Sequence, residues 1–141
     1  MIYLAQTDST AGFLSESLEE LNAAKGRDIA TPCIKTMDSF YKLKALTRVP
    51  LAHKNRVRRA KKSSFILSNK KSFRVVKDHP HASFLKGFAF LYSSSANAHG
   101  QGFCPEWAKS KADIIINEEL YEAKPSAIFK LSALRIRRLR A

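Results

Sequence analysis

Short apolar runs separated by polar stretches recur along the chain and predict a series of buried strands. The most aromatic of them, Phe88–Tyr92, has the length and composition of a buried strand. Two neighbouring runs, Ser64–Leu67 and Phe73–Val76, are joined by a short polar segment and predict a hairpin. The remaining predicted strands are Ile2–Leu4, Cys33–Lys35, Ile114–Ile116 (buried), Ala127–Leu131 and a half-buried final strand over Leu134–Arg140.

Helical patterns lie between these runs. Ser17 and Glu20 form a capping box, apolar residues follow at helical spacing, and Gly26 supplies a C-terminal stop. Other predicted helices are Phe40–Leu46, a basic helix over Lys54–Lys61, a brief one at Phe84–Leu85 and one that starts at Pro105. With no internal repeat and no linker, the 141 residues predict one domain over 1–141, of α/β (α+β) class, with a twisted mixed β-sheet flanked by helices.

Composition excludes several classes of protein. The 45% content of hydrophobic residues is too high for a disordered chain, and no apolar run approaches the length of a membrane span. The first residues show neither the basic nor the long apolar region of a signal peptide. Cys33 and Cys104 lack both zinc spacing and a disulfide framework, and we expect reduced thiols in a cytoplasmic protein with no membrane partner.

Positive charge is concentrated in one stretch. The net charge is +13, and the stretch Ser39–Lys77 contains thirteen Lys and Arg but no Asp or Glu. A solvated basic face is one explanation. The absence of interspersed carboxylates favours contact with RNA or a nucleotide. The candidate RNA-binding residues are Arg56, Arg58, Arg59, Lys61 and Lys62.

Small polar residues follow two of the predicted strands. Ser93–Ser95 and Asn97 come directly after Phe88–Tyr92, and Thr7–Gly12 follows the first strand. Such residues place hydroxyls, an amide and free backbone N–H groups at a sheet edge, where open α/β sheets bind ligands; a plain serine-rich turn is the alternative. Lys25 and Arg27 flank the helix-ending glycine, either as cap charges or as a phosphate clamp.

Taken together, these turns resemble the YrdC/TsaC family, the threonylcarbamoyl-AMP synthases of tRNA modification. The resemblance rests on six motifs in family order: Thr7-Asp8-Ser9-x-x-Gly12, Lys25-Gly26-Arg27, an arginine-bearing strand followed by Asp78-His79-Pro80, Ser95-Ala96-Asn97-Ala98-His99-Gly100, Pro125-Ser126-Ala127-Ile128, and the final Arg140.

The chain also departs from the family pattern. Ala60-Lys61-Lys62-Ser63-Ser64 stands in place of the family's Pro-Gly-Pro-x-Thr turn, so that only the hydroxyl of Ser64 is kept. The family tyrosine of the first turn is Ala11, and the spacing from Arg74 to His79 is one residue longer than in the family. These changes leave open whether activity survives.

The resemblance implies that L-threonine, bicarbonate and ATP give L-threonylcarbamoyl-AMP and pyrophosphate. It implies ATP contacts for Lys25, Arg27, Ser64, Asn97 and Arg140. For threonine it implies Ser9, Ser95 and Ser126. Magnesium would arrive with ATP, and the four histidines (His53, His79, His81 and His99) have no metal-ligand pattern, so we expect no protein-bound metal.

Two classes of function remain from the sequence. The first is a synthase, with tRNA and other tRNA-modification proteins as partners. The second is a module for tRNA or double-stranded RNA that has weakened or lost catalysis, which the missing Pro-Gly-Pro turn favours. A role in hydrogenase maturation, where related domains occur, is less expected because no companion domains accompany this one.

Overall fold

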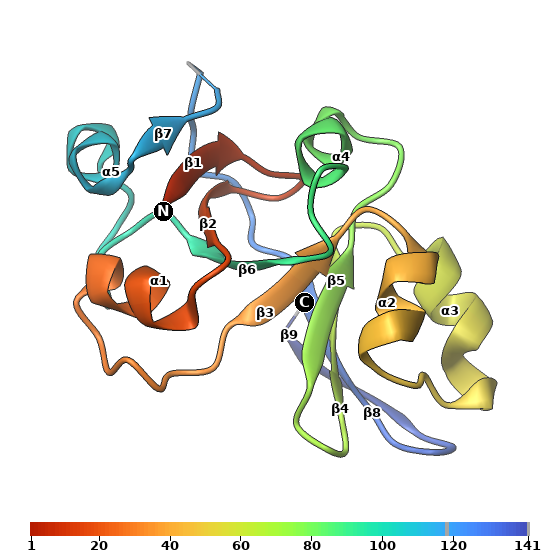
Figure 1. Cartoon of the computed structure of the whole chain (residues 1–141). Helices are drawn as coiled ribbons and strands as arrows, with labels where there is room; N and C mark the ends of the chain where they lie inside the picture. Colours follow the sequence, from red (N-terminus) through yellow and green to blue (C-terminus); the bar gives the residue numbers. More distant parts are fainter. Residues whose placement is uncertain (118, 141) are drawn as a thin grey trace. The chain divides into compact units, whose positions relative to one another are not determined.

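The computed structural model describes residues 1–117 and 119–140, which adopt a mixed α/β fold (Figure 1). Parallel and antiparallel strand pairs both occur, and helices flank them, so the predicted fold class is confirmed. The residues group into two compact units: unit 1 comprises Met1–Cys33 and Leu91–Pro125, and unit 2 comprises Ile34–Phe90 and Ser126–Ala141. A single domain over 1–141 stays a prediction. Among the described residues, no helix has both the length and the apolar character needed to cross a membrane.

Unit 1 is built around strands in the order β7-β1-β2-β6. β7 runs parallel to β1, while β2 is antiparallel to both β1 and β6. Its core joins Leu4 and Phe13 of the strands with Leu21 of the first helix and Ala108 of the last. The elements are β1 (Tyr3–Gln6), β2 (Ala11–Ser15), α1 (Leu18–Lys25), β6 (Leu91–Ser95), α5 (Pro105–Lys111) and β7 (Ile114–Ile115).

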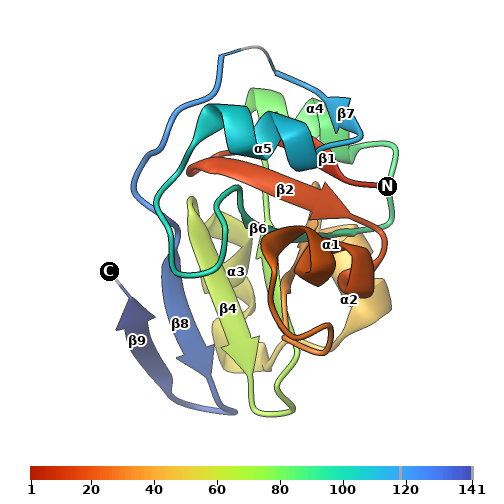
Figure 2. The same ribbon diagram turned by 90° about the vertical axis from the view of Figure 1, so that its left-hand side faces the viewer.

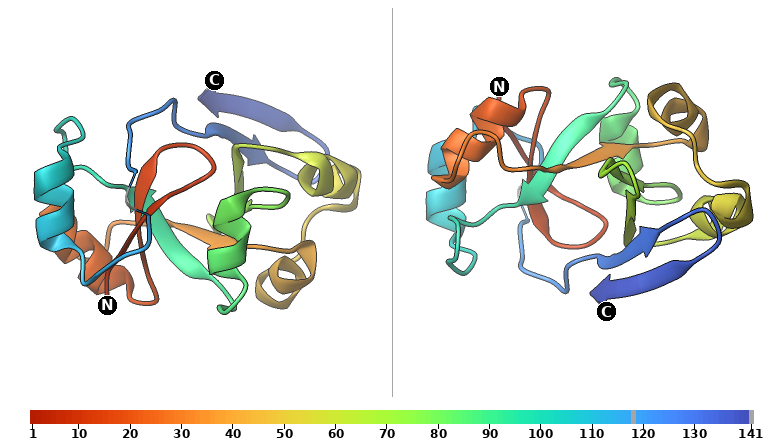
Figure 3. Two further views of the ribbon diagram at one scale, coloured as in Figure 1. Left: turned by 90° about the horizontal axis from the view of Figure 1, so that it is seen from above. Right: turned by 90° about the horizontal axis from the view of Figure 1, so that it is seen from below.

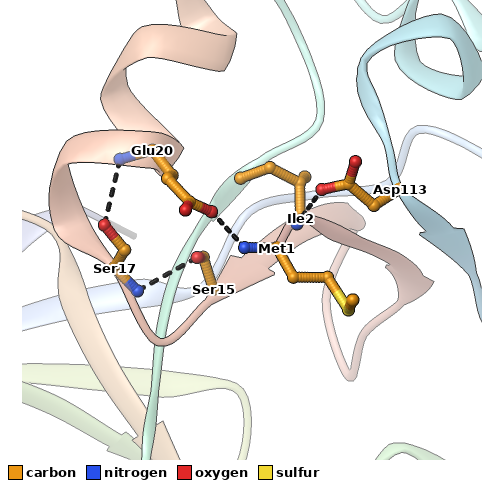
Figure 4. A network of polar contacts seen from close by, with 6 residues as sticks. All are labelled: Met1, Ile2, Ser15, Ser17, Glu20 and Asp113. Carbon is orange, nitrogen blue, oxygen red and sulfur yellow. Dashed lines mark hydrogen bonds and ion pairs between the residues drawn. The ribbon is translucent and has the colours of Figure 1, made fainter.

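The ends of α1 follow the predicted signals. The Ser17 hydroxyl accepts a hydrogen bond from the Glu20 backbone N–H at 3.2 Å, and Gly26 ends the helix at φ 71°. Figure 4 shows that the Glu20 carboxylate also pairs with the Met1 amino group. The Ile2 backbone N–H donates to the Asp113 carboxylate at 2.7 Å (Figure 4), so the start of β1 is tied to both α1 and the segment before β7.

Two strand predictions in unit 1 need correction, and one strand was missed. β2 was not predicted, because it contains a glycine and its apolar run is short. All of its residues are nevertheless buried. β6 begins at Leu91 rather than Phe88 and contains the serines, because Ser93–Ser95 pair with Gly12–Leu14 of β2. The strand at Ile114–Ile116 is two residues long and exposed, with 40% of Ile114 accessible, because it lies at the edge of the unit 1 strands.

Unit 2 has strands in the order β3-β5-β4-β8-β9, and Figures 2 and 3 show β8 and β9 as a long hairpin. β3/β5 and β4/β8 are parallel, whereas β4/β5 and β8/β9 are antiparallel. The elements are β3 (Ile34–Met37), α2 (Phe40–Leu46), η1 (Leu51–His53), α3 (Lys54–Arg59), β4 (Ser63–Leu67), β5 (Ser72–Val75), α4 (Pro80–Leu85), β8 (Ala127–Leu131) and β9 (Ile136–Arg140).

The core of unit 2 lies between these strands and helices α2 and α3. Leu43 and Val57 from the two helices pack with Phe65 and Phe73 from the strands. The predicted helix over Phe40–Leu46 and the β4–β5 hairpin are confirmed. The last strand is less buried than predicted: only its first residue is half-buried, because β9 is at the edge of the unit 2 strands.

Candidate functional site

The polar turn after β1 and the end of β6 lie at one edge of the unit 1 strands. β2 follows the turn directly, and its Gly12 is opposite Ser95, the last residue of β6. Beyond the strand end, the Ala96 backbone N–H still donates to the Ala11 carbonyl at 2.9 Å. The register therefore places the turn that contains Ser9 next to the segment from Ser95 to Asn97.

The turn is held by its own hydroxyls and by a close approach at Gly12. The buried Thr7 hydroxyl donates to the Thr10 carbonyl at 2.6 Å and lies 3.3 Å from the Ser9 hydroxyl. A Cβ atom at Gly12 would lie 2.8 Å from Cγ2 of Thr7 and 3.3 Å from the carbonyl oxygen of Ser94. Glycine is needed here so that the turn and β6 can approach each other.

A buried lysine points at the end of β6. Lys25, the last residue of α1, is only 4% exposed. Its ammonium donates to the Ser95 carbonyl at 2.6 Å and lies 3.5 Å from the Ser95 hydroxyl and 3.4 Å from Oδ1 of Asn97. Ser95 and Asn97 are themselves hydrogen-bonded through their side chains. Lys25, Arg27, Ser94, Ser95 and Asn97 are called the Lys25 cluster below.

The side chain of Arg27 contacts three residues, of which the sequence analysis did not single out Asn22. Its Nε donates to Oδ1 of Asn22 at 2.7 Å, and its Nη2 contacts Sγ of Cys33 at 2.9 Å and the Ser94 hydroxyl at 3.4 Å. Asn22 is fully buried and donates to the Ile29 and Thr31 carbonyls, so it fixes the loop as well as the guanidinium. The only sequence signal for Asn22 was an amide inside the predicted helix, and its burial is known only from the structure.

The environment of the Lys25 cluster changes two pKa values. Burial, with repulsion from Arg27 as a smaller cause, lowers the pKa of Lys25 to about 8. Burial also raises the pKa of the Cys33 thiol, against the opposing effect of Arg27. An incoming anion would stabilise the charged ammonium, so the Lys25 cluster is suited to binding a phosphate or carboxylate.

Unit 2 brings together the three other predicted hydroxyl and arginine residues. The hydroxyls of Ser64 and Ser126 are 2.8 Å apart in a buried position. Arg140 donates from Nε to the Ser126 carbonyl at 2.8 Å, and its Nη2 lies 3.4 Å from the Ser126 hydroxyl. Ser64, Ser126 and Arg140 are called the Ser126 cluster below.

The predicted RNA-binding arginines of α3 do not share one surface. Arg56 and Arg59, three residues apart, line an open pocket, while the Arg58 guanidinium lies over the Phe40 ring at 4.7 Å from its centroid. Lys61 and Lys62 are exposed on the segment that replaces the family's Pro-Gly-Pro turn, and Lys62 has φ 49°. The Lys62 carbonyl accepts from the Ala127 N–H at 3.0 Å, which ties this segment to the start of β8.

Two of the four histidines contribute to the structure at separate points. His53 is buried, with Nε2 at 2.9 Å from the Ser132 carbonyl, and the His79 side chain caps α4. Within the residues that the structure describes, no group of three or more His, Cys, Asp and Glu side chains could hold a metal ion.

Several solved structures have a similar fold. A Pyrococcus abyssi Sua5 with two substitutions is similar at TM-score 0.79 and 18% identity, over 99% of this chain and 49% of that one. The P. abyssi Sua5 complexed with L-threonine is similar at TM-score 0.72 and 20% identity, over 92% and 47%. E. coli YciO is similar at TM-score 0.74 and 18% identity, over 99% and 82%. The chain has a YrdC-like fold.

Sequence comparison adds nothing to this likeness. No protein-family model matches the chain, and no curated protein matches it. The chain spans about half the length of the Sua5 proteins. At these identities the likeness establishes the fold and leaves activity and ligands as proposals.

Proposed function

We propose that this chain makes L-threonylcarbamoyl-AMP for tRNA threonylcarbamoyladenosine modification. The observation that carries the proposal is the buried Lys25 ammonium, held 2.6 Å from the Ser95 carbonyl and 3.4 Å from the Asn97 amide oxygen. These residues occupy the Lys-Gly-Arg and Ser-Ala-Asn motifs of the family resemblance. The structure of P. abyssi Sua5 with L-threonine adds support, since that protein shares the fold and binds the proposed substrate.

The reaction couples L-threonine, bicarbonate and ATP to L-threonylcarbamoyl-AMP, pyrophosphate and water. The threonine nitrogen attacks the bicarbonate carbon and water leaves, which gives a carbamate. A carbamate oxygen then attacks the α-phosphorus as pyrophosphate leaves. No covalent protein intermediate is required, so the protein contributes positioning and charge stabilisation. Magnesium enters as part of the MgATP substrate.

The chain's own residues match these tasks. The Lys25 cluster offers a cation to phosphate oxygens, and Asn97 offers an amide to the nucleotide. We assign threonine contacts to the small hydroxyls of Ser9 and Ser95. The ATP contacts of Ser64 and Arg140 and the threonine contact of Ser126, all in unit 2, stay predictions from the family resemblance. The cytoplasm, which supplies ATP and tRNA, is the proposed compartment.

Radioactive pyrophosphate exchange into ATP tests the proposal. We expect exchange that requires both threonine and bicarbonate, and calorimetry in which ATP binds more tightly than AMP. If no exchange occurs and ATP binds no better than AMP, the synthase proposal is contradicted.

A second function is favoured by the charge of unit 2. The chain would then be a module for double-stranded RNA or tRNA in which catalysis is lost, in line with the absent Pro-Gly-Pro turn. RNA binding with a steep salt dependence but no exchange activity would support this function over the first.

A further inference from the structure

A pocket of about 500 Å³ opens in unit 2 between α3 and the strands β4 and β8. A volume of this size falls within the range of small-ligand sites, roughly 300–1,000 Å³. Figure 2 shows α3 together with these two strands. The side chains that line the pocket and matter for its chemistry are Asn55, Arg56, Arg59, Ser63, Phe65 and Phe129.

This pocket lies on the other face of β4 from the Ser126 cluster. Side chains alternate along a strand, so Ser63 and Phe65 point away from the face that carries Ser64. Phe65 is directly opposite Phe129 in the β4–β8 register, and their rings stack with centroids 5.7 Å apart. The pocket is therefore distinct from the residues assigned to ATP and threonine.

The two arginines of the pocket are available to an external anion. Arg56 and Arg59 are both exposed, and neither has a hydrogen bond or ion pair with any residue in 1–117 or 119–140. Unit 2 contains only two acidic residues, Asp38 and Asp78, and Asp38 already pairs with Lys42 at 2.6 Å. Within unit 2, there are therefore too few carboxylates to compensate most of this positive charge.

An aromatic surface stands beside these cations. Phe129 is half-buried, and the Arg138 guanidinium lies 5.8 Å from its ring centroid. Unpaired bases stack on aromatic side chains, and guanidinium groups bind phosphate through paired N–H donors. Asn55 and Ser63 add an amide and a hydroxyl that can bond to the polar edge of a base.

We propose that this pocket binds an unpaired nucleotide, with its phosphate on Arg56 and Arg59 and its base against Phe129. The nucleotide is either free or part of a single RNA strand. Duplex RNA is excluded from the pocket because its bases are paired and stacked on one another. The proposal goes beyond the synthase reaction and does not depend on it.

Binding of three probes to the full chain tests the proposal: AMP, an eight-nucleotide oligoadenylate and a duplex RNA of eight base pairs. The charge variant is Arg56→Ala/Arg59→Ala, and its matched control is Arg48→Ala/Arg137→Ala, which removes two exposed arginines of unit 2 outside the pocket. The stacking variant is Phe129→Leu, which keeps an apolar side chain in β8. Thermal unfolding checks that each variant is folded.

We expect the charge variant to weaken oligoadenylate binding about tenfold more than its control does. Phe129→Leu should weaken it about fivefold or more and leave duplex binding unchanged. AMP binding that falls in parallel identifies the free nucleotide as a ligand, whereas losses confined to oligoadenylate identify the RNA strand.

The proposal is overturned if the charge variant and its control lose the same affinity for oligoadenylate and Phe129→Leu binds it as tightly as the wild type. If Phe129→Leu does not fold, Ala52→Leu replaces it, because this exposed residue lines the pocket and the change fills space without altering charge. Oligoadenylate binding unaffected by Ala52→Leu is then the contradicting result. Threonine-dependent exchange, measured on the same variants, reports separately on the synthase proposal.

Discussion

The two units of this chain carry opposite charge. Unit 1 has five Lys and Arg against ten Asp and Glu, a net charge of −5, whereas unit 2 has twenty against two, a net charge of +18. Yet the most buried cation of the predicted site belongs to the acidic unit. Lys25 is 4% exposed and held by a carbonyl, while Arg56 and Arg59 of unit 2 are exposed and extend to solvent.

This difference separates two ways of using a positive charge. A buried cation with fixed acceptors is already oriented, so that it can stabilise charge at one atom of a small substrate. Exposed cations without nearby carboxylates act together as a field, which attracts a polyanion and weakens as salt rises. The total charge of +13 would by itself have drawn attention only to the second.

The largest expected effect comes from removing the buried cation. Lys25→Met should lower threonine-dependent exchange about 100-fold, because oriented charge stabilisation in a dry site is typically worth that much. Lys124→Met removes an exposed lysine from the same unit and should leave the rate within about twofold. Similar rates in the two variants would show that burial confers no special role on Lys25.

The salt dependence of RNA binding sharpens the contrast from the other unit. Arg56→Ala/Arg58→Ala/Arg59→Ala should flatten the slope of log K against log salt by about 2 to 3, since each lost phosphate contact changes it by roughly 0.7–0.9. The matched variant removes three exposed lysines of unit 1, Lys109, Lys111 and Lys124. A slope that changes equally in both variants would mean that RNA does not distinguish the units.

The close approach at Gly12 predicts a smaller effect, on stability. Gly12→Ala should lower the free energy of unfolding by about 1–3 kcal/mol, because the added methyl meets Thr7 and the backbone of β6. Gly102→Ala serves as control, since its Cβ would have no neighbour within 4 Å. Denaturant titration of both variants measures the difference, and equal stabilities would argue against the tight packing at this sheet edge.

The pH dependence caused by Lys25 gives a further test of the buried charge. The pKa of the Lys25 ammonium is 10.5 in the unfolded chain and about 8 in the folded chain. Between pH 8 and 10.5 the unfolded state therefore binds more protons. The free energy of unfolding should therefore rise from pH 8 to 10.5, and Lys25→Met should lose that rise. Cys33 lowers the free energy of unfolding as pH rises, because folding raises the pKa of its thiol. The chain with Lys25 and the Lys25→Met variant are therefore compared in a Cys33→Ala background. Parallel pH curves would contradict the lowered pKa.

Local signals in the sequence located much of the fold. The helix over Phe40–Leu46 was predicted to the residue, with Asp38 or Ser39 as its start, and the structure shows Ser39 as the N-cap. Ser17 and Gly26 likewise fixed both ends of α1 through interactions within a few residues. The strand at Ala127–Leu131 was also recognised from its own residues.

Strands whose identity depends on a distant partner were harder to recognise. β2 contains Gly12, which is unfavourable in strands, yet all of its residues are buried between β1 and β6. The serines of β6 were predicted as a turn because strand propensity omits the pairing with β2. Exposure of Ile114 and Ile115 depends on their position at the edge, which no local pattern reveals.

By itself, the sequence determined the ends of the helices, the excess of positive charge and the order of the motifs, because each depends on residues that are near one another in the chain. Only the tertiary structure decided that Lys25 meets Ser95 and Asn97, that Ser64 meets Ser126, and that Arg56 and Arg59 line a pocket that Arg58 does not. These contacts arise from strand register and from side-chain direction on a helix, and both are fixed by the packing of segments far apart in the sequence.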